Sequence, residues 1–316
     1  MLQNGLVVAG FGRHVLVETD AGKRIICHPR GKKNTAVVGD RIKWLATQDE
    51  GTIEKLEPRR NLFYRQDEIR TKSFAANLDQ ILILIAAEPE FSESQLSRAL
   101  IAAEAEHIKP IIALNKSDLK VPFAKAWERL QPYKEMGYDV VSLSLKPKNG
   151  SIASDAADFD IEQIEQQTEL LMSLLQGKTT LVLGPSGAGK STLINAVVPN
   201  ATVFTQEISQ ALNSGKHTTT STTWYWVDEA KTTALIDSPG FQEFGLNHIE
   251  AMHLASYMPD FKVHVPNCKF YNCSHLHEPG CGVLESMKSD SNQRKISLER
   301  YRIYSSLFAE LSEVRY

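Results

Sequence analysis

The chain has 316 residues, of which 42% are hydrophobic and 23% charged, and its formal net charge is −3. This length allows two or three domains, and the composition is typical of a globular protein. No apolar run approaches the roughly 18 residues of a membrane span, and the first residues lack the basic-then-apolar pattern of a secretory signal. We therefore exclude a membrane-spanning protein and expect a cytoplasmic one.

Charge is distributed unevenly along the chain. The net charge is +5 over residues 1–72, −10 over residues 73–260 and +2 over residues 261–316. The overall negative charge argues against a protein whose whole surface coats nucleic acid. If the chain contacts RNA, we expect its two basic ends to make that contact. Ordinary variation of surface charge is the alternative.

The first 66 residues contain short runs of alternating apolar and polar residues, separated by turns that contain glycine. Such runs at this spacing predict a small β-barrel. Cys27 lies alone in one of the predicted strands, and we expect it to be a buried thiol.

From about residue 78 the pattern changes to that of an α/β domain. Residues 82–85 and 111–114 are continuous apolar runs, as expected for buried parallel strands. Between them, Ser92 and Gln95 fit a capping box at the start of an amphipathic helix. Strand, helix and strand in this order predict a crossover unit. The polar segment 146–160 is predicted to be a loop before a helix that runs to about residue 176.

The stretch Asn115-Lys116-Ser117-Asp118 directly follows the second of these strands. The carboxylate of Asp118 can accept two hydrogen bonds from the N1–H and N2–H₂ edge of guanine, whereas adenine has no matching donor pair. Asn115 would bind the loop and the base, and the stem of Lys116 would cover the base plane. A site that depends on a buried hydrogen bond discriminates by on the order of 10⁴-fold or more. A solvated polar turn is the alternative, but the position after a buried strand favours guanine recognition.

A phosphate loop occupies residues 184–191, which match G-x-x-x-x-G-K-S between a predicted strand and a predicted helix. The glycines let backbone N–H groups curl around phosphate oxygens, and the helix N-terminus favours negative charge. Lys190 is expected to reach the β- and γ-phosphates, and Ser191 to bind Mg²⁺. This motif alone does not separate GTP from ATP. Its candidate nucleotide-binding residues are Gly184, Pro185, Ser186, Gly187, Ala188, Gly189, Lys190, Ser191 and Thr192.

A third motif, Asp237-Ser238-Pro239-Gly240, follows the predicted strand 234–236. We expect Asp237 to hold Mg²⁺ through water and the backbone N–H of Gly240 to contact the γ-phosphate. The next residue is Phe241, where many small GTPases have a glutamine that orients water. Phenylalanine cannot orient water, so either intrinsic hydrolysis is slow or another residue performs this task.

The segment 215–220 lies between the phosphate loop and Asp237, where the first switch of a GTPase belongs. A threonine there would contact Mg²⁺ and the γ-phosphate, and we favour Thr219 over Thr218. His217 is the nearest titratable group that could position the attacking water. An exposed loop histidine without this role is the alternative. The predicted catalytic residues are therefore His217, Lys190 and Thr219, and the predicted Mg²⁺ ligands are Ser191, Thr219 and Asp237.

The order of the three motifs is unusual. In an ordinary guanine-nucleotide switch protein the N-K-x-D element follows the other two, whereas here it precedes them. The sequence therefore predicts a circularly permuted GTPase.

Three of the four cysteines cluster with histidine in the pattern Cys268-x₄-Cys273-x-His275-x₅-Cys281. Three thiolates and one imidazole form a closed ligand set suited to structural zinc rather than to catalysis. The spacing favours His275 over His277 as the fourth ligand but leaves both open. The alternative is three unrelated cysteines. Four basic residues further along, Arg294, Lys295, Arg300 and Arg302, could meet phosphate or could form a solvated helix face.

Together, the permuted order, the β-rich first segment and the cysteine spacing resemble the RsgA (also called YjeQ) family of ribosome small-subunit-dependent GTPases. The resemblance covers nearly the whole chain. Further matching blocks are Val38-Gly39-Asp40, Pro58-Arg59 and Asn77-Leu78-Asp79-Gln80.

This resemblance implies a multidomain protein with three parts. They are an N-terminal OB-fold β-barrel that binds RNA (1–70), a central α/β circularly permuted P-loop GTPase (71–244) and a C-terminal helical zinc-binding domain (245–316). It also implies a late maturation factor of the small ribosomal subunit, whose GTPase is stimulated by that subunit and whose hydrolysis times release. The cofactors would be GTP or GDP, Mg²⁺ and one Zn²⁺. The partners would be the small subunit and its rRNA, without DNA or membrane, and a monomer is expected.

The family's switch histidine matches His217, and its hydrophobic residue after the D-x-P-G element matches Phe241. The family also has an S-A element that supports the base, for which Ser142 is the best candidate, although Leu143 stands where alanine is usual. Three alternatives to the implied function are a GTPase for large-subunit assembly, a nucleotide-gated RNA-binding module and an ATPase. Asp118 disfavours the last of these.

Overall fold

The computed structural model describes residues 1–11, 14–30, 36–47, 50–67, 70–145, 161–199, 201, 222–240, 244–288 and 296–313. The expected loop 146–160 lies outside these residues. Among the described helices, none combines the length and the apolar character that crossing a bilayer requires.

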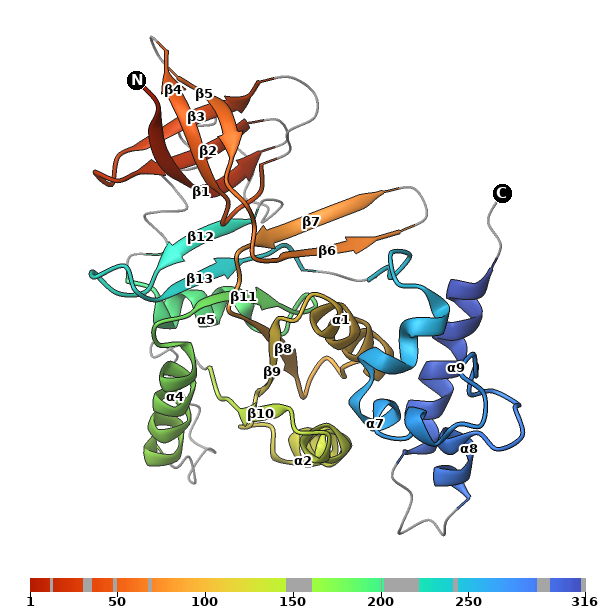
Figure 1. Cartoon of the computed structure of the whole chain (residues 1–316). Coiled ribbons are helices and arrows are strands. Elements are labelled where there is room, and N and C mark those ends of the chain that lie inside the picture. The colour runs from red at the N-terminus through yellow and green to blue at the C-terminus, as the bar shows by residue number, and fades with distance from the viewer. Residues whose placement is uncertain are drawn as a thin grey trace.

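The N-terminal segment forms a closed barrel of five strands, as the alternating sequence predicted (Figure 1). The first strand pairs with both the second and the fourth, and the third pairs in parallel with the fifth, which closes the circle. Branched aliphatic side chains such as Val17, together with Cys27 and Trp44, fill its core, and burial raises the pKa of the Cys27 thiol to about 11. The strands are β1 (Gln3–Phe11), β2 (His14–Thr19), β3 (Arg24–Pro29), β4 (Arg41–Ala46) and β5 (Gly51–Leu56).

A two-stranded hairpin, β6 (Leu62–Gln66) and β7 (Thr71–Ala76), follows the barrel. Phe63 and Phe74 of this hairpin pack against Phe244, with ring centroids 5.6 to 6.0 Å apart in the three-ring cluster. The boundary expected at residue 70 therefore falls between two paired strands. The hairpin lies against the segment that leads out of the Asp237 motif.

The central sheet contains five parallel strands in the order β10-β9-β8-β11-β13, with β12 antiparallel at the end. All seven residues of β8 are buried, because helices cover both faces of the sheet. Alternate residues of this strand, such as Ile83 and Leu84, therefore enter two different clusters. The strands are β8 (Gln80–Ala86), β9 (Lys109–Asn115), β10 (Asp139–Ser142), β11 (Thr179–Leu183), β12 (Thr223–Trp226) and β13 (Ala234–Asp237).

Helices on one face of the sheet share a hydrophobic cluster with the C-terminal region, and helices on the other face form a separate cluster. Ser92 caps the first helix by accepting a hydrogen bond from the backbone N–H of Gln95 (3.3 Å), as its capping box predicted. The first group comprises α1 (Glu93–Ala105), α2 (Lys120–Arg129) and α3 (Gln131–Glu135), and the second comprises α4 (Ile161–Leu175) and α5 (Lys190–Val197).

Barrel and central sheet are joined by direct strand pairing. β1 pairs antiparallel with β12, so the barrel strands and the central strands form one continuous sheet of 11 strands. Beside this pairing, the carboxylate of Glu18 accepts hydrogen bonds from the indole of Trp226 (2.9 Å) and the ammonium of Lys231 (2.6 Å). The barrel is therefore attached to β12, the strand that precedes β13 in the chain.

The C-terminal region is helical and packs against α1 (Figure 1). Its helix α9 contributes Arg300, which is 3% exposed and binds Asp260 through two hydrogen bonds of 2.9 Å and Ser97 of α1 through one of 2.7 Å. The elements are η1 (Ala251–Tyr257), α7 (Pro259–Lys262), η2 (Val265–Asn267), α8 (Gly282–Met287) and α9 (Leu298–Ser312).

Candidate functional site

The three nucleotide motifs meet at one edge of the central sheet. The N-K-x-D stretch follows the end of β9, the phosphate loop follows β11, and Asp237 ends β13. These strands run parallel, with β8 between β9 and β11. Because parallel strands place their carboxyl ends at the same edge, motifs that occur in permuted order along the chain lie together in space.

A close approach of the Asn115 side chain to the backbone of the phosphate loop joins this loop to the N-K-x-D stretch. Gly189, which precedes α5, has a φ of +106°, and a Cβ placed on it would lie 2.4 Å from the amide nitrogen of Asn115. That amide donates to the carbonyl of Ala188 at 2.9 Å. Only glycine fits this conformation and this space. The glycine at position 189 is therefore needed for the contact between the two motifs as well as for binding phosphate.

The N-K-x-D stretch is held in a turn by its own side chains. The buried carbonyl oxygen of the Asn115 side chain accepts a hydrogen bond from the backbone N–H of Leu145 at 3.1 Å. Lys116 adopts a φ of +67°, and its ammonium donates to the carbonyl of Glu88. Asp118 accepts a hydrogen bond from the hydroxyl of Ser144 at 3.3 Å. Asn115 thus ties together the phosphate loop and the segment after β10.

The hydroxyl beside Asp118 belongs to Ser144, and not to Ser142, which the family pattern suggested. Ser142 is the last residue of β10 and lies opposite Leu114 in the parallel pairing of β9 and β10. The chain leaves the sheet after it, so Ser144 and Leu145 reach the N-K-x-D turn. The sequence contained a usable signal, since Ser144-Leu145 also resembles an S-A pair. The end of the strand, which decides between the two serines, is visible only in the structure.

Two opposite charges, the half-buried Lys190 and the buried Asp237, lie at the centre of the motifs. Lys190 donates to the carbonyls of Gly184 (2.7 Å) and Pro185 (2.9 Å), and burial lowers its pKa although Asp237 opposes this. Burial raises the pKa of Asp237 to about 6 despite the neighbouring Lys190 ammonium. One carboxylate oxygen of Asp237 is buried without a hydrogen-bond partner. A buried oxygen of this kind suits a cation or a water held by one.

Gly240 lies against the phosphate loop. A Cβ placed on Gly240 would lie 3.2 Å from the Lys190 ammonium and 3.5 Å from the backbone nitrogen of Ser186. The remaining loop residues, Gly187 and the buried Ala188, continue into α5, whose first turn contains Ser191 and Thr192. The predicted phosphate-contacting residues thus lie together at this edge of the sheet.

Three of the predicted functional positions lie outside the described residues. These are His217 and Thr219, assigned to catalysis and Mg²⁺, and Phe241, assigned to the water-orienting position. Their roles stay predictions. The same applies to Arg294 and Lys295 as phosphate contacts, whereas Arg300 is buried in an ion pair and Arg302 is exposed.

A compact ligand cluster lies in the C-terminal region. Ligand atoms of Cys268, Cys273, His275 and Cys281 all lie within 4.8 Å of one another. The Nδ1 atom of His275 is 3.5 Å from the sulfurs of both Cys268 and Cys281. His277, the alternative ligand, is exposed and outside this set. The donor set fits a closed tetrahedral metal site.

Hydrogen bonds from α9 and from a neighbouring carboxylate support this cluster. The hydroxyls of Tyr301 and Tyr304 donate to the carbonyls of His275 (3.0 Å) and Ser274 (2.9 Å). The carboxylate of Glu278 accepts hydrogen bonds from the backbone N–H and the hydroxyl of Ser274. Burial alone would raise the pKa of Glu278, but these bonds lower it to about 2. Such outer bonds hold ligands in position before the metal binds.

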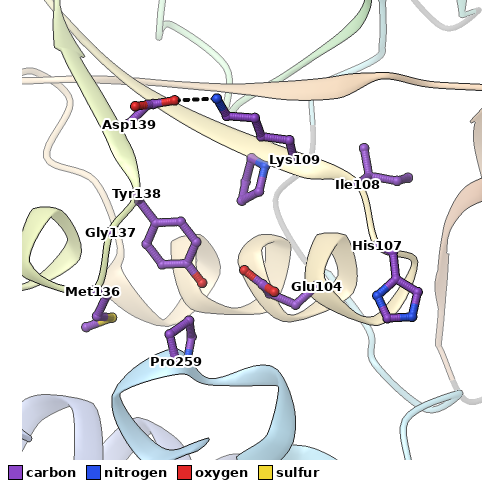
Figure 2. Close-up of a pocket in the computed structure, with 10 residues that line it drawn as sticks. Glu104, His107, Ile108, Lys109, Met136, Gly137, Tyr138, Asp139 and Pro259 are labelled. Carbon is purple, nitrogen blue, oxygen red and sulfur yellow. Dashed lines mark ion pairs between the residues drawn. The ribbon is translucent and has the colours of Figure 1, made fainter. Parts of the chain in front are cut away.

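A pocket of about 390 Å³ lies at the opposite end of β9. Figure 2 shows Tyr138 pointing toward Glu104, and a dashed line marks the ion pair between Lys109 and Asp139 (2.7 Å). Pro259 of the C-terminal region closes one side. Since β9 begins at Lys109 and ends at Asn115, the pocket is separated from the nucleotide motifs by the length of this strand. It is a feature of the seam between domains.

Comparison with known proteins agrees with this geometry. A family model described as RsgA GTPase matches residues 56–247. The chain is 68% identical over 316 residues to a protein of Variovorax paradoxus (strain S110) named small ribosomal subunit biogenesis GTPase RsgA, with 100% of this chain and 95% of the relative covered. The chain belongs to the RsgA GTPase family. A second relative of that name, from Paraburkholderia phytofirmans, is 47% identical over 315 residues and covers 98% of this chain and 94% of its own length.

Solved structures of the RsgA family share the fold. The crystal structure of YjeQ from Thermotoga maritima matches with a TM-score of 0.71 and 27% identity and covers 100% of both chains. The structure of YloQ, described as a circularly permuted GTPase, matches with a TM-score of 0.67 and 26% identity over 100% of this chain and 98% of that one. Barrel, permuted GTPase region and Cys₃His cluster with helices are therefore confirmed as the architecture of this chain.

Proposed function

We propose that this RsgA-family GTPase hydrolyses GTP to GDP and phosphate as a late-stage maturation factor of the small ribosomal subunit. The subunit stimulates hydrolysis, and hydrolysis times release. The observation that carries the proposal is the hydrogen bond between Asn115 and the carbonyl of Ala188, which unites guanine-specific and phosphate-binding motifs in one site. The names of the relatives supply the link to the small subunit.

Guanine selection rests on Asp118. Its carboxylate accepts the two donors of the guanine edge, while the Ser144 hydroxyl, at 3.3 Å, holds it in orientation. The backbone around Leu145, fixed by Asn115 at 3.1 Å, supports the base in the role that the sequence assigned to Ser142. Adenine would leave Asp118 unpaired, which is a large penalty at a site built on hydrogen bonds.

The phosphates lie between the loop and Gly240. Lys190 exchanges its carbonyl partners for β- and γ-phosphate oxygens, and backbone N–H groups of the loop surround the remaining charge. Ser191 and Thr219 would hold Mg²⁺ directly and Asp237 through water, and the unpartnered buried oxygen of Asp237 supports its role. The cation would neutralise charge on the phosphates.

Water activation is assigned to His217, because Phe241 has no group that orients water. Hydrolysis without the subunit is accordingly slow, and contact with the subunit stimulates it.

The Cys₃His cluster holds one structural zinc ion. Three thiolates and the His275 imidazole leave no open position for substrate, so the metal stabilises a segment with few large apolar residues. We further propose that the barrel and the zinc-binding region contact rRNA, that the chain acts as a cytoplasmic monomer and that it binds neither DNA nor membrane. The hairpin 62–76 is grouped with the GTPase region, because its aromatic residues pack on Phe244.

The test is GTP hydrolysis with purified small subunits, with large subunits and without either. Wild type should be stimulated strongly by small subunits alone, and ATP should compete poorly. Lys190→Ala serves as the inactive control. Asp118→Asn should lose GTP and gain xanthosine triphosphate, whose carbonyl at C2 matches an amide donor. Tight GTP binding without stimulation would instead favour a nucleotide-gated RNA-binding module, and stimulation by large subunits a different assembly role.

A further inference from the structure

The loop between the first two cysteines of the metal cluster presents two aromatic side chains to solvent. Tyr271 has a relative exposure of 103% and Phe270 of 41%. Aromatic side chains of this size are usually at least half-buried, since each hides a large apolar area when packed. Tyr271 is thus placed at an outer tip of the molecule rather than in its core.

This tip is attached at both ends to rigid structure. Cys268 and Cys273, two of the four residues of the metal cluster, flank the tip directly. The backbone N–H of Lys269 donates to the carbonyl of Gly280 at 2.9 Å, and the N–H of Gly282 donates to the Cys268 sulfur at 3.3 Å. A short loop held in this way loses little conformational freedom when a ligand contacts it.

The segment that leads into the tip is basic. Residues 262–272 contain two lysines and no aspartate or glutamate. Both Lys262 and Lys269 are exposed, and the Lys269 ammonium lies 5.6 Å from the Phe270 ring centroid. An exposed aromatic pair beside lysine matches the chemistry of unpaired nucleotides, whose bases stack on aromatic rings while lysine meets phosphate.

We propose that Phe270 and Tyr271 form a stacking platform for unpaired bases of RNA and that Lys269 contacts the adjoining phosphate. The inference rests on the proposed function, which supplies rRNA as the source of those bases. The four exposed residues 269–272 present too small a surface for a stable protein interface, which takes about 800 Å² from each partner. Stacking of an aromatic ring on a base requires only the face of the ring, so this small surface suffices for it.

The experiment measures affinity for purified small subunits, with a GTP analogue present, at several salt concentrations. Tyr271→Ala should weaken binding by about 5- to 150-fold, the range found when an aromatic ring that stacks on one base is replaced by alanine, without changing the salt dependence. Tyr271→Phe should stay within about twofold of wild type, because it keeps the ring. Lys269→Gln should instead reduce the slope of log K against log salt by about 1.

A second measurement identifies the occupant. Replacement of Tyr271 by p-benzoylphenylalanine should give a cross-link to rRNA on illumination, whereas cross-linking only to a ribosomal protein would overturn the proposal. Equal affinity of wild type and Tyr271→Ala would also overturn it, as would a Tyr271→Phe variant as weak as Tyr271→Ala. Zinc content and hydrolysis without subunits should be unchanged in every variant.

The outcomes separate the two proposals. If small subunits stimulate wild type and Tyr271→Ala binds equally well, the platform fails and the proposed function stands. If wild type neither binds small subunits nor responds to them, both fail together.

Discussion

Asp237 is 6% exposed, and burial raises its pKa from the ordinary aspartate value of 3.8 to about 6. Its folded-state pKa lies above the unfolded value, so ionisation costs stability as pH rises through the window from about 4 to about 6. The full cost, on the order of 3 kcal/mol, is present at pH 7 in protein without nucleotide or Mg²⁺. A buried carboxylate that weakens the fold in this way fits the proposed role of Asp237 in holding Mg²⁺ through water.

We expect Asp237→Asn to stabilise the nucleotide-free protein at pH 7 by about 3 kcal/mol, because the buried charge is removed. At about pH 4, where the carboxyl group is protonated, variant and wild type should be equally stable. Urea unfolding at the two pH values checks this, and Mg²⁺-dependent GTP binding should fall in parallel. Equal stabilisation at both pH values would show that ionisation is not the cause.

The two histidines of the metal loop provide a matched pair of variants. His275→Ala should reduce zinc affinity by more than about 100-fold, since loss of a supporting residue alone costs about 10- to 100-fold. His277→Ala should retain zinc, because His277 is exposed and outside the cluster. Metal analysis after dialysis against a chelator measures both. Zinc loss from the His277 variant alone would reverse the assignment.

At the level of elements, the junction of β1 and β12 depends on one carboxylate. Glu18, 6% exposed, binds Trp226 and Lys231 from the GTPase region and Arg24 from its own barrel. Burial opposes ionisation of Glu18, but the bonds from Lys231 and Trp226 outweigh it and lower its pKa. The resulting stabilisation is present above the ordinary glutamate pKa of 4.5, which applies to the unfolded chain, and is lost as pH falls through the lower folded-state value.

Glu18→Ala should destabilise the protein by about 1–3 kcal/mol at pH 7, because it leaves buried donors without an acceptor. Urea unfolding at pH 7 measures the effect. The control Glu285→Ala, which removes an exposed ion pair with Lys288, should cost less than about 1 kcal/mol. A Glu18 variant no weaker than this control would contradict the role of the junction.

At the level of the whole molecule, a buried ion pair attaches the C-terminal region to the GTPase region. Arg300 of α9 reaches Asp260 and also Ser97 of α1. Arg98 of α1 forms an ion pair with Glu310 of α9. It also donates a hydrogen bond to the backbone carbonyl of Phe244 (3.2 Å). The exit from the Asp237 motif and the last helix therefore share one anchor on α1.

Removal of one partner of the buried pair should be costly. Asp260→Ala and Arg300→Met should each destabilise the protein by about 3–5 kcal/mol. The first variant leaves the guanidinium of Arg300 without its partner in the core, and the second leaves the carboxylate of Asp260. The double variant should lose less than the sum, and a double-mutant cycle by urea unfolding measures the difference. Strict additivity would show that the two side chains do not act together.

Much of the candidate site could be predicted from local sequence. The spacing around Lys190, the carboxylate of Asp118 and the cysteine cluster are local patterns whose chemistry follows from residue type. The sequence did not decide between His275 and His277, because both spacings are compatible with a ligand. The family pattern pointed to Ser142, whereas the hydroxyl beside Asp118 is that of Ser144, since the end of β10 depends on pairing with β9 and not on local preference.

The sequence by itself determined the permuted motif order, the buried strands that carry the motifs and the closed ligand set for a metal, because these are properties of residue type and short spacing. Only the tertiary structure decided which distant segments meet. It brought Asn115 to Ala188, Glu18 to Trp226 and Arg300 to Ser97. Each of these contacts joins elements far apart in the chain, and its geometry is set by sheet order and by helix packing, which no local pattern encodes.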